Sequence, residues 1–225
     1  MPATSITAED VRRGLPYPVG VGIRRTSDAD EARLHADEVA LLGPNAVDRR
    51  RRYFALGRAA AHDALGELGI DGVAVGRGAA GEPVWPRGVV GAIAHAGDVA
   101  VGLVGWTREY AGLGVDVEEL ARGPSPRAAR LVCRPAEMEW ADVESGTRRL
   151  TMLFSAKEAV FKAVFPLERV WLGFGDAELT WVPERCGFDA RLLKQASASY
   201  PVGSVLPVFC TLTATQVLCT TYCEP

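Results

Sequence analysis

The sequence predicts a pseudo-duplicated α+β protein of two similar halves. Each half contains one long amphipathic helix followed by several short strand patterns, and the strands are mainly antiparallel. The chain also lacks the regular strand and helix alternation of a parallel doubly wound sheet. Of its 225 residues, 48% are apolar, which is enough to bury a core in each half. We expect two subdomains, at residues 1–108 and 109–225.

The first half opens irregularly and then shows two helical patterns. A short helix is expected over residues 28–42, and Gly43-Pro44-Asn45 supplies a stop and the N-cap of the next helix. The long helix then covers residues 46–68, and Gly69 is placed to end it. Its apolar positions recur on one face, so this helix should pack on the strands that follow.

Short β-rich patterns follow this helix. A turn at Ala96-Gly97-Asp98 makes a hairpin of two of them, and a Gly/Pro-rich loop over residues 81–86 separates them from the preceding pattern. The expected strands are residues 73–75, 89–95, 99–104 and 113–117.

The second half repeats this order. After a Pro-rich break at 122–126 come two helical stretches, the second at 147–165 and ended by Pro166. The expected strands are residues 177–181, 188–192, 206–213 and 216–221.

Composition limits the classes of partner. A net charge of −3 gives no overall positive field for nucleic acid, and the basic run at residues 49–52 is only a local feature. The N-terminal segment lacks the apolar core of a signal peptide, and no stretch approaches the roughly 18 apolar residues of a membrane span. We therefore expect a cytoplasmic protein without membrane or nucleic-acid partners. Five cysteines without a CxxC pair indicate reduced thiols.

Two acidic residues stand two apart in an extended segment. In Gly114-Val115-Asp116-Val117-Glu118, both carboxylates should project from one face of the strand while the valines enter the core. Carboxylate oxygens are the ligands that Mg²⁺ prefers. An acidic strand end that merely faces solvent explains this motif equally well.

A second motif lies on the later long helix. Glu158 and Lys162 are one turn apart with Ser155 beside them, which offers a third carboxylate and a cation on one face. Taken alone, an ordinary exposed Glu–Lys pair is the better interpretation.

Together the two motifs resemble the paired signature of the Sfp-type 4′-phosphopantetheinyl transferases, GVDVE followed by [FW]SxKEAxxK. Further segments look like the enterobactin synthetase component D and actinobacterial branch of that family, and their order along the chain agrees. These segments are residues 54–61, 81–88 and 91–95.

The resemblance implies a ligand set. Asp116, Glu118 and Glu158 would bind Mg²⁺, with Mn²⁺ as an alternative, together with the pyrophosphate of coenzyme A. Asp116, Glu158 and Lys162 would form the catalytic set, in which Glu158 acts as general base and Lys162 also contacts a phosphate. Lys157 would be a further phosphate or pantetheine contact.

The nucleotide end of coenzyme A would be held by basic residues of the first half. The resemblance assigns this role to Arg51, Arg58 and His95. Without the resemblance, an exposed helical arginine is the better interpretation of Arg58, and a satisfied histidine at a strand end is the better interpretation of His95. Relatives often carry a basic residue where this chain has Glu82, so Arg77 is expected to supply that charge.

The implied reaction transfers 4′-phosphopantetheine from coenzyme A to a serine of an apo acyl or peptidyl carrier protein, for polyketide, nonribosomal peptide or siderophore assembly. It needs a metal, cations and a carboxylate rather than a covalent enzyme intermediate. The internal duplication favours a monomer. Two rivals remain: a non-catalytic module that binds coenzyme A or carrier proteins, and a nucleic-acid binder that uses the arginine run.

Overall fold

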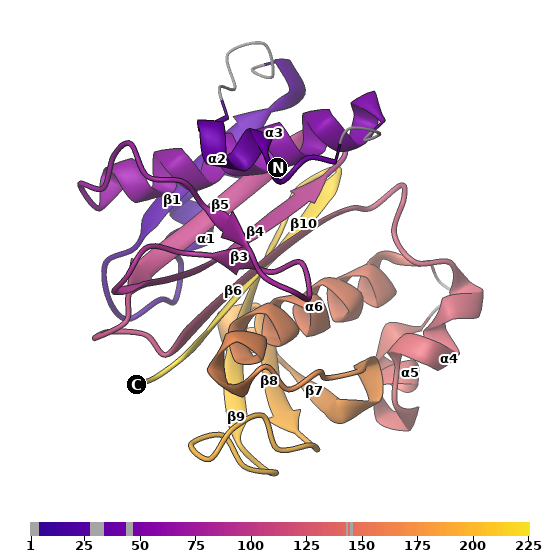
Figure 1. Ribbon diagram of the computed structural model, residues 1–225. Coiled ribbons are helices and arrows are strands. Elements are labelled where there is room, and N and C mark those ends of the chain that lie inside the picture. Colours follow the sequence, from indigo (N-terminus) through magenta and orange to yellow (C-terminus); the bar gives the residue numbers. More distant parts are fainter. Residues whose placement is uncertain (1–4, 28–33, 44–46, 143, 145) are drawn as a thin grey trace.

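A computed structural model describes residues 5–27, 34–43, 47–142, 144 and 146–225. Two larger antiparallel sheets lie next to each other, and each carries one long helix (Figure 1). Strands β2 and β3 form a separate two-stranded sheet. The first sheet has the strand order β1-β5-β4, and helix α3 packs on β1 and β5. The second has the order β6-β10-β9-β8-β7, and helix α6 packs on β6 and β10. The predicted α+β class is confirmed.

The first half is assembled mostly around α3, whose buried face consists largely of alanines that let the sheet approach closely. Helix α1 begins with a capping box formed by Thr7 and Asp10. The elements of this half are α1 (Ala8–Arg12), β1 (Gly20–Arg25), α2 (Ala36–Val39), α3 (Asp48–Glu67), β2 (Gly76–Arg77), β3 (Pro83–Val84), β4 (Val89–Ala96) and β5 (Val99–Trp106).

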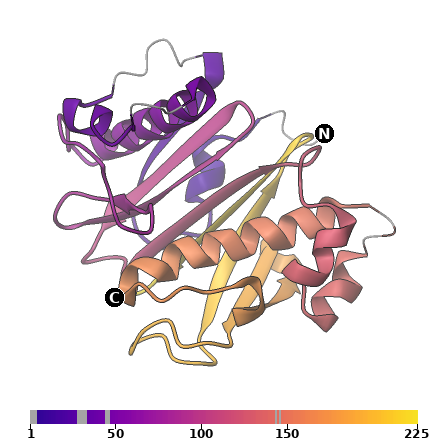
Figure 2. The same cartoon turned by 45° about the vertical axis from the view of Figure 1, so that its right-hand side comes forward.

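The second half follows directly, and α6 crosses its sheet in the same manner (Figure 2). Its core combines the inner face of α6 with residues of β7 to β10. The elements are β6 (Gly112–Glu119), η2 (Pro126–Ala128), α4 (Ala129–Val132), α5 (Pro135–Ala141), α6 (Arg148–Glu168), η3 (Phe174–Asp176), β7 (Ala177–Val182), η4 (Pro183–Arg185), β8 (Gly187–Leu192), β9 (Val205–Leu212) and β10 (Gln216–Cys223).

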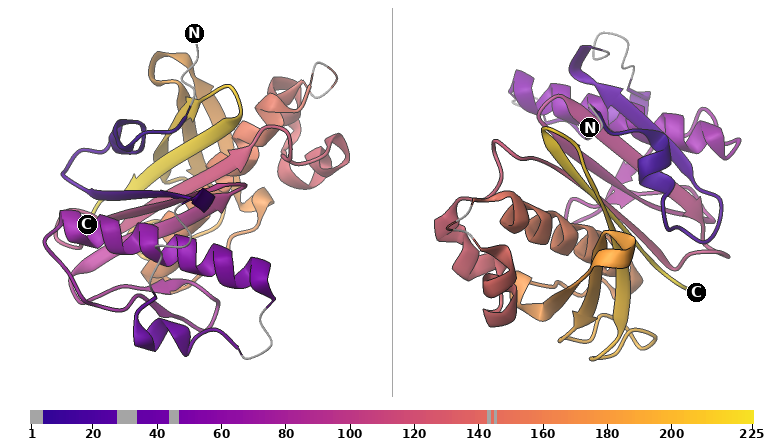
Figure 3. Two further views of the ribbon diagram at one scale, coloured as in Figure 1. Left: turned by 90° about the horizontal axis from the view of Figure 1, so that it is seen from above. Right: turned by 180° about the vertical axis from the view of Figure 1, so that it is seen from behind.

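The two sheets also share a core. Leu103 of β5 and Val115 and Val117 of β6 belong to one buried cluster. Views from above and from behind show α3 along the outer side of the first sheet and α1 beside β1 and β10 (Figure 3). None of the helices in the described ranges is long and apolar enough to cross a lipid bilayer.

Several boundaries differ from the sequence prediction. The opening expected to be irregular contains α1 and β1, while residues 73–75 precede a two-residue strand rather than forming one. A helix was expected over residues 28–42. Within the described residues 34–42, only α2 is helical. The predicted N-cap Asn45 lies outside the described residues.

The prediction that Pro166 stops the second long helix was wrong. Pro166 lies inside α6, which continues to Glu168 and ends where Arg169 adopts a left-handed conformation with φ 56°. The last turn closes through the Arg169 amide, which donates to the Phe165 carbonyl at 2.8 Å. Proline removes one helical hydrogen bond and its ring crowds the preceding turn. Here the helix continues for two residues beyond it and then ends.

The duplication extends to single residues that the sequence did not make obvious. A Cβ at Gly22 of β1 would lie 2.0 Å from the Ala60 carbonyl of α3, and one at Gly114 of β6 would lie 2.0 Å from the Ala159 carbonyl of α6. Both strands therefore need glycine where a helix backbone touches them. Strands β1 and β6 also occupy equivalent places, each paired with the last strand of its own half.

Candidate active site

Strand β6 presents its acidic residues to α6. Val115 and Val117 are fully buried in the core between the sheets, and Gly114 touches α6 on the opposite face. Alternation along the strand therefore puts Asp116 and Glu118 on one face, as predicted, and the structure adds that this face meets α6. There Lys162 donates from Nζ to Asp116 Oδ1 at 2.7 Å and to the Val115 carbonyl at 3.2 Å.

Burial and neighbouring negative charge raise the proton affinity of two carboxylates in this region, Glu118 and Glu158. Burial, followed by the negative charge of Asp116, raises the pKa of Glu118 to about 7, and Glu158 adds to the shift. The pKa of Glu158 is also raised, first by burial and then by Asp116. Lys162 opposes both shifts. Three acids and one ammonium thus form one electrostatic unit between β6 and α6.

These acids suit a divalent cation in their chemistry. Asp116 is nearly buried, and its Oδ2 has no hydrogen-bond partner among the described residues, which is costly for a carboxylate oxygen. A hard cation would satisfy that oxygen and relieve the repulsion between the acids. In their present positions, however, no three His, Cys, Asp or Glu side chains of the described residues meet the geometry of a metal site. Rotation of the carboxylate side chains would be needed to bring their oxygens together around one cation.

A cationic pocket of about 330 Å³ lies between α3 and the end of β4. Its walls include three of the residues predicted for the nucleotide end of coenzyme A, namely Arg58, Arg77 and His95. Arg50 lines it as well. Four basic side chains around one cavity indicate a site for an anionic ligand.

Arg58 is the most buried of these cations. Its Nη2 donates to the Gly76 carbonyl at 2.9 Å, and its guanidinium lies 4.6 Å from the centre of the Phe54 ring. Burial lowers the pKa of Arg58, the nearby carboxylate of Glu38 raises it, and Arg77 lowers it again. The exposed helical arginine that the sequence also allowed is therefore wrong.

His95 connects the pocket to the acids. Its ring meets Tyr53 edge-on at 5.1 Å between ring centres, while one side of the residue stays open to solvent. Burial of the ring lowers the pKa of His95, Lys162 lowers it further, and Asp116 raises it. The cationic pocket and the acidic unit are therefore neighbouring parts of one site.

Two further cavities continue along α6. One of about 260 Å³ shares Gly81 and Ile93 with the cationic pocket and is closed on its other side by Lys162 and aromatic residues. The next, of about 350 Å³, contains Glu158 and shares Trp171 with the second. The three cavities are therefore neighbours in a row, from the arginines past Lys162 to Glu158.

The residue of the arginine run that lines the cationic pocket differs from the one predicted from the sequence. Arg50, rather than the predicted Arg51, stands in the wall. The wall of α3 is formed by Arg50, Tyr53, Phe54, Gly57 and Arg58, so it follows the helix face that looks toward β4. The spacing between Arg51 and Arg58 suggested a shared face, but it could not show which side of the helix the strand covers.

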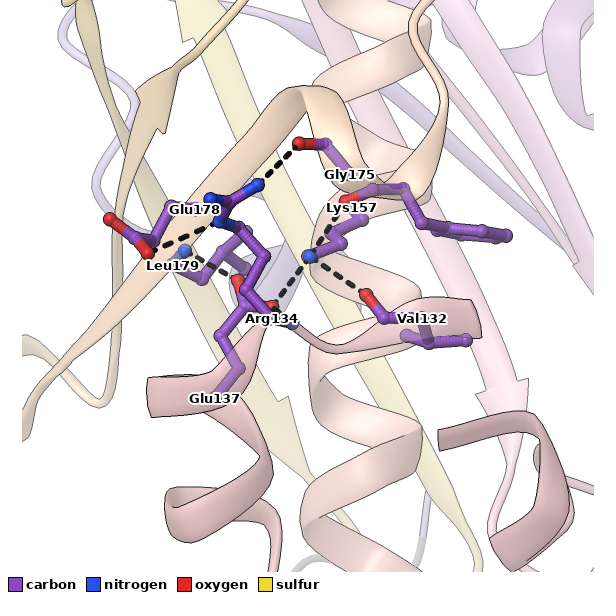
Figure 4. A network of polar contacts seen from close by, with 8 residues as sticks. Val132, Arg134, Glu137, Lys157, Gly175, Glu178 and Leu179 are labelled. Carbon is purple, nitrogen blue, oxygen red and sulfur yellow. Dashed lines mark hydrogen bonds and ion pairs between the residues drawn. The ribbon is translucent and has the colours of Figure 1, made fainter. Parts of the chain in front are cut away.

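Lys157 has a different environment from the one predicted (Figure 4). Its Nζ donates to Glu137 Oε2 at 2.7 Å and to the carbonyls of Val132 and Phe174 at 2.8 Å each. All three ammonium hydrogens are used, and the side chain is 2% exposed. In this arrangement Lys157 has no donor left for a phosphate, and it joins α4, α5 and η3 to α6.

Glu82 contacts the second half instead of the pocket. Its carboxylate pairs with Arg169 at the end of α6 and accepts from the Ala80 amide at 3.0 Å. Arg77, beside Gly81, is the cation that this loop region presents to the pocket, as expected.

Acids on a strand, a lysine above them and a cluster of arginines nearby define the class of protein: an enzyme that handles a phosphorylated substrate. Comparison with known proteins specifies the family. Residues 37–105 match the model of the 4′-phosphopantetheinyl transferase N-terminal domain, and residues 112–205 match that of the 4′-phosphopantetheinyl transferase superfamily.

Curated relatives agree. The chain is 37% identical over 153 residues to the 4′-phosphopantetheinyl transferase Npt of Nocardia iowensis, covering 68% of each chain. It is 38% identical over 169 residues to Svp of Streptomyces mobaraensis, covering 70% of this chain and 68% of that protein. Enterobactin synthase component D of Salmonella typhi is 30% identical over 175 residues, or 74% of this chain and 72% of the relative. The chain belongs to the 4′-phosphopantetheinyl transferase superfamily.

Proposed function

We propose that this chain transfers the 4′-phosphopantetheine arm of coenzyme A to a serine of apo acyl or peptidyl carrier proteins and releases 3′,5′-ADP. The observation that carries the proposal is the junction of the acidic unit, Asp116, Glu118 and Glu158, with the pocket of Arg58, Arg77 and His95. A diphosphate ester needs both parts: cations for its phosphates and a carboxylate for the incoming hydroxyl.

Each part of the site has its own role in the proposed reaction. The cationic pocket binds the nucleotide phosphates, and Lys162 holds the diphosphate next to Asp116. The carrier serine oxygen forms a bond to the β-phosphorus while the bond from that phosphorus to the bridging oxygen breaks, so that 3′,5′-ADP leaves. Glu158 accepts the serine proton, a role that its raised pKa supports.

We assign the divalent cation to Asp116, Glu118 and Glu158, and we propose Mg²⁺ as the physiological ion. When bound, it neutralises the diphosphate oxygens and stabilises the charge of the leaving group. The buried Oδ2 of Asp116 supports this assignment.

The carrier protein is proposed to dock where α4 meets the Glu158 cavity. Leu131 and Trp171 border this cavity and are 72% and 61% exposed, large fractions for apolar side chains. Arg127 and Arg130 flank this region, and their charge suits the acidic helix of a carrier protein. Charge reversal of both arginines should slow transfer to the carrier, and unchanged transfer would rule out this docking site.

We further propose a monomer with subdomains at 1–108 and 109–225 and with coenzyme A lying across the junction. Strands β4 and β6, one from each half, pack together there and support a fixed junction. We propose carriers of polyketide, nonribosomal peptide or siderophore assembly as substrates, and the relative named enterobactin synthase component D supports a role in the assembly of such a product.

The test is intact-protein mass spectrometry of apo carrier proteins from these pathways after incubation with the chain, coenzyme A and Mg²⁺. We expect a mass gain of one phosphopantetheine, which disappears with chelator and with Glu158→Gln. No gain on any carrier, despite measurable binding of coenzyme A, would favour a non-catalytic binding module instead.

A further inference from the structure

Glu38 is a fully buried carboxylate close to the cationic pocket. It lies on the short helix α2, where it caps the helix start by accepting from the His35 amide at 3.0 Å through Oε2. Its Oε1 accepts from His62 Nε2 at 2.8 Å and from the Val75 amide at 2.8 Å. A charged group without solvent contact persists only when its partners compensate for lost hydration.

Arg58 completes this environment. Its Nε lies 3.9 Å from Glu38 Oε1 and has no hydrogen-bond partner among the described residues, so Glu38 is the negative charge that offsets this buried guanidinium. Arg58 also binds the carbonyl of Gly76, the residue after Val75. Arg77 follows immediately and lines the pocket.

We propose that Glu38 is a positioning residue for the cationic pocket. It holds Arg58 and the segment that carries Arg77 in the positions in which they bind the ligand. This inference rests on the proposed function, because coenzyme A is the ligand of the pocket. Glu38 does not line the pocket itself and acts through its two neighbours.

The internal duplication provides a matched control. Glu137 is the counterpart of Glu38: it is also buried, accepts from the N-cap amide of its own short helix, and accepts from a strand amide, that of Leu179. The same number of residues separates Glu38 from Glu137 as separates Arg58 from Lys157. The two pairs differ in what their cations can reach. Lys157 is enclosed by protein, whereas Arg58 lines the cationic pocket.

The experiment compares Glu38→Gln with Glu137→Gln by measuring kcat and KM for coenzyme A, direct binding of coenzyme A by calorimetry, and the unfolding transition. We expect Glu38→Gln to raise KM and the dissociation constant about tenfold or more, as the loss of an outer partner does at other sites, with kcat changed by less than about twofold. Glu137→Gln should lower stability without a selective rise in KM. Equal effects of both variants on KM and kcat would overturn the proposal.

A double-mutant cycle with Arg58→Met tests the route of the effect. Glu38→Gln should raise KM by a smaller factor in the Arg58→Met background than in the wild type, because only the effect through the segment that carries Arg77 remains. Full additivity would overturn the proposal. Should Glu38→Gln fail to unfold cooperatively, Glu38→Asp replaces it, because aspartate at this helix position still caps, as Asp10 does in α1, but withdraws from Arg58.

Measurements on the wild-type chain separate the proposed function from the role of Glu38. A wild-type chain that neither binds coenzyme A nor modifies a carrier would contradict the proposed function. A wild-type chain that does both, with a normal KM for Glu38→Gln, would contradict the role of Glu38 alone.

Discussion

Lys162 Nζ lies 2.7 Å from Asp116 Oδ1, so an ammonium of α6 closes over the strand that carries the acids. The same nitrogen reaches the Val115 carbonyl, which fixes its position along β6. With Glu118 and Glu158 close by, this single cation offsets part of the repulsion between three carboxylates. The pair is therefore the centre of the acidic unit.

Asp116→Asn should lower kcat at least about 100-fold, because it removes a charge from the site where charge develops in the reaction. The protein should still fold, since asparagine has the same shape. Steady-state kinetics on a carrier protein would measure the loss. Asp189→Asn is the control, because Asp189 lies on β8, which β9 and β10 separate from β6. Similar kinetics for the two variants would contradict the assignment.

Lys157→Met should lower the free energy of unfolding by about 3 kcal/mol, since it leaves the buried Glu137 carboxylate without its cation. Denaturant titration would measure this. The exposed Lys194, which donates to the Trp171 carbonyl, is the comparison, and Lys194→Met should cost less than about 1 kcal/mol. If Lys157→Met is as stable as the wild type but has a raised KM for coenzyme A, the result would support the prediction that Lys157 contacts coenzyme A.

Arg50→Met should raise KM for coenzyme A by more than Arg51→Met does, because Arg50 lines the pocket. A loss of one charge-assisted contact corresponds to about tenfold in affinity. Calorimetry with coenzyme A would rank the two variants. The reverse ranking would support the choice made from helical spacing.

The stability that Glu38 contributes should depend on pH. Burial raises the pKa of Glu38, but the hydrogen bonds from His62, Val75 and His35 together outweigh burial and lower it below its ordinary value of 4.5. A lowered pKa in the folded state means that the contribution is complete above the unfolded pKa and is lost as pH falls through the folded one. The stability difference between wild type and Glu38→Gln should therefore stay constant from neutral pH down to about pH 5 and shrink as the pH falls below 4.5. A difference independent of pH would show that the charge has no part in it.

Gly114→Ala should destabilise the second half, because its Cβ would meet the Ala159 carbonyl at 2.0 Å. Such overpacking costs about 1 to 3 kcal/mol. Thermal unfolding would detect it, and Gly175→Ala, where a Cβ meets nothing within 4 Å, should change the transition little. Equal transitions for both variants would argue against the close packing of β6 on α6.

Much of the fold could be predicted because the apolar patterns are strong. The strands that became β4, β5 and β6 were expected within one or two residues. Strands β4 and β5 are nearly continuous apolar runs bounded by turn residues, and β6 alternates apolar and acidic residues. Strand β1 was missed because its glycines weaken the strand pattern, and the reason for those glycines is the tertiary contact with α3.

The composition of the site was easier to predict than its geometry. Alternation alone placed Asp116 and Glu118 on one face, and the structure adds that this face meets Lys162. The partners of buried side chains could not be predicted from the sequence. Nothing in the position of Lys157 beside Glu158 indicates that its ammonium points inward to Glu137. The role of Glu38 was missed for the same reason, although the equal spacing of the two buried pairs was a signal that could have been found.

The most direct test of the central claim measures both products of one reaction. Holo-carrier protein, by intact mass, and 3′,5′-ADP, by chromatography, should appear in a one-to-one ratio, depend on a divalent cation and disappear together in Asp116→Asn and Glu158→Gln. Release of 3′,5′-ADP without modified carrier, or modification that survives the loss of Glu158, would contradict a transfer that uses the acids between β6 and α6.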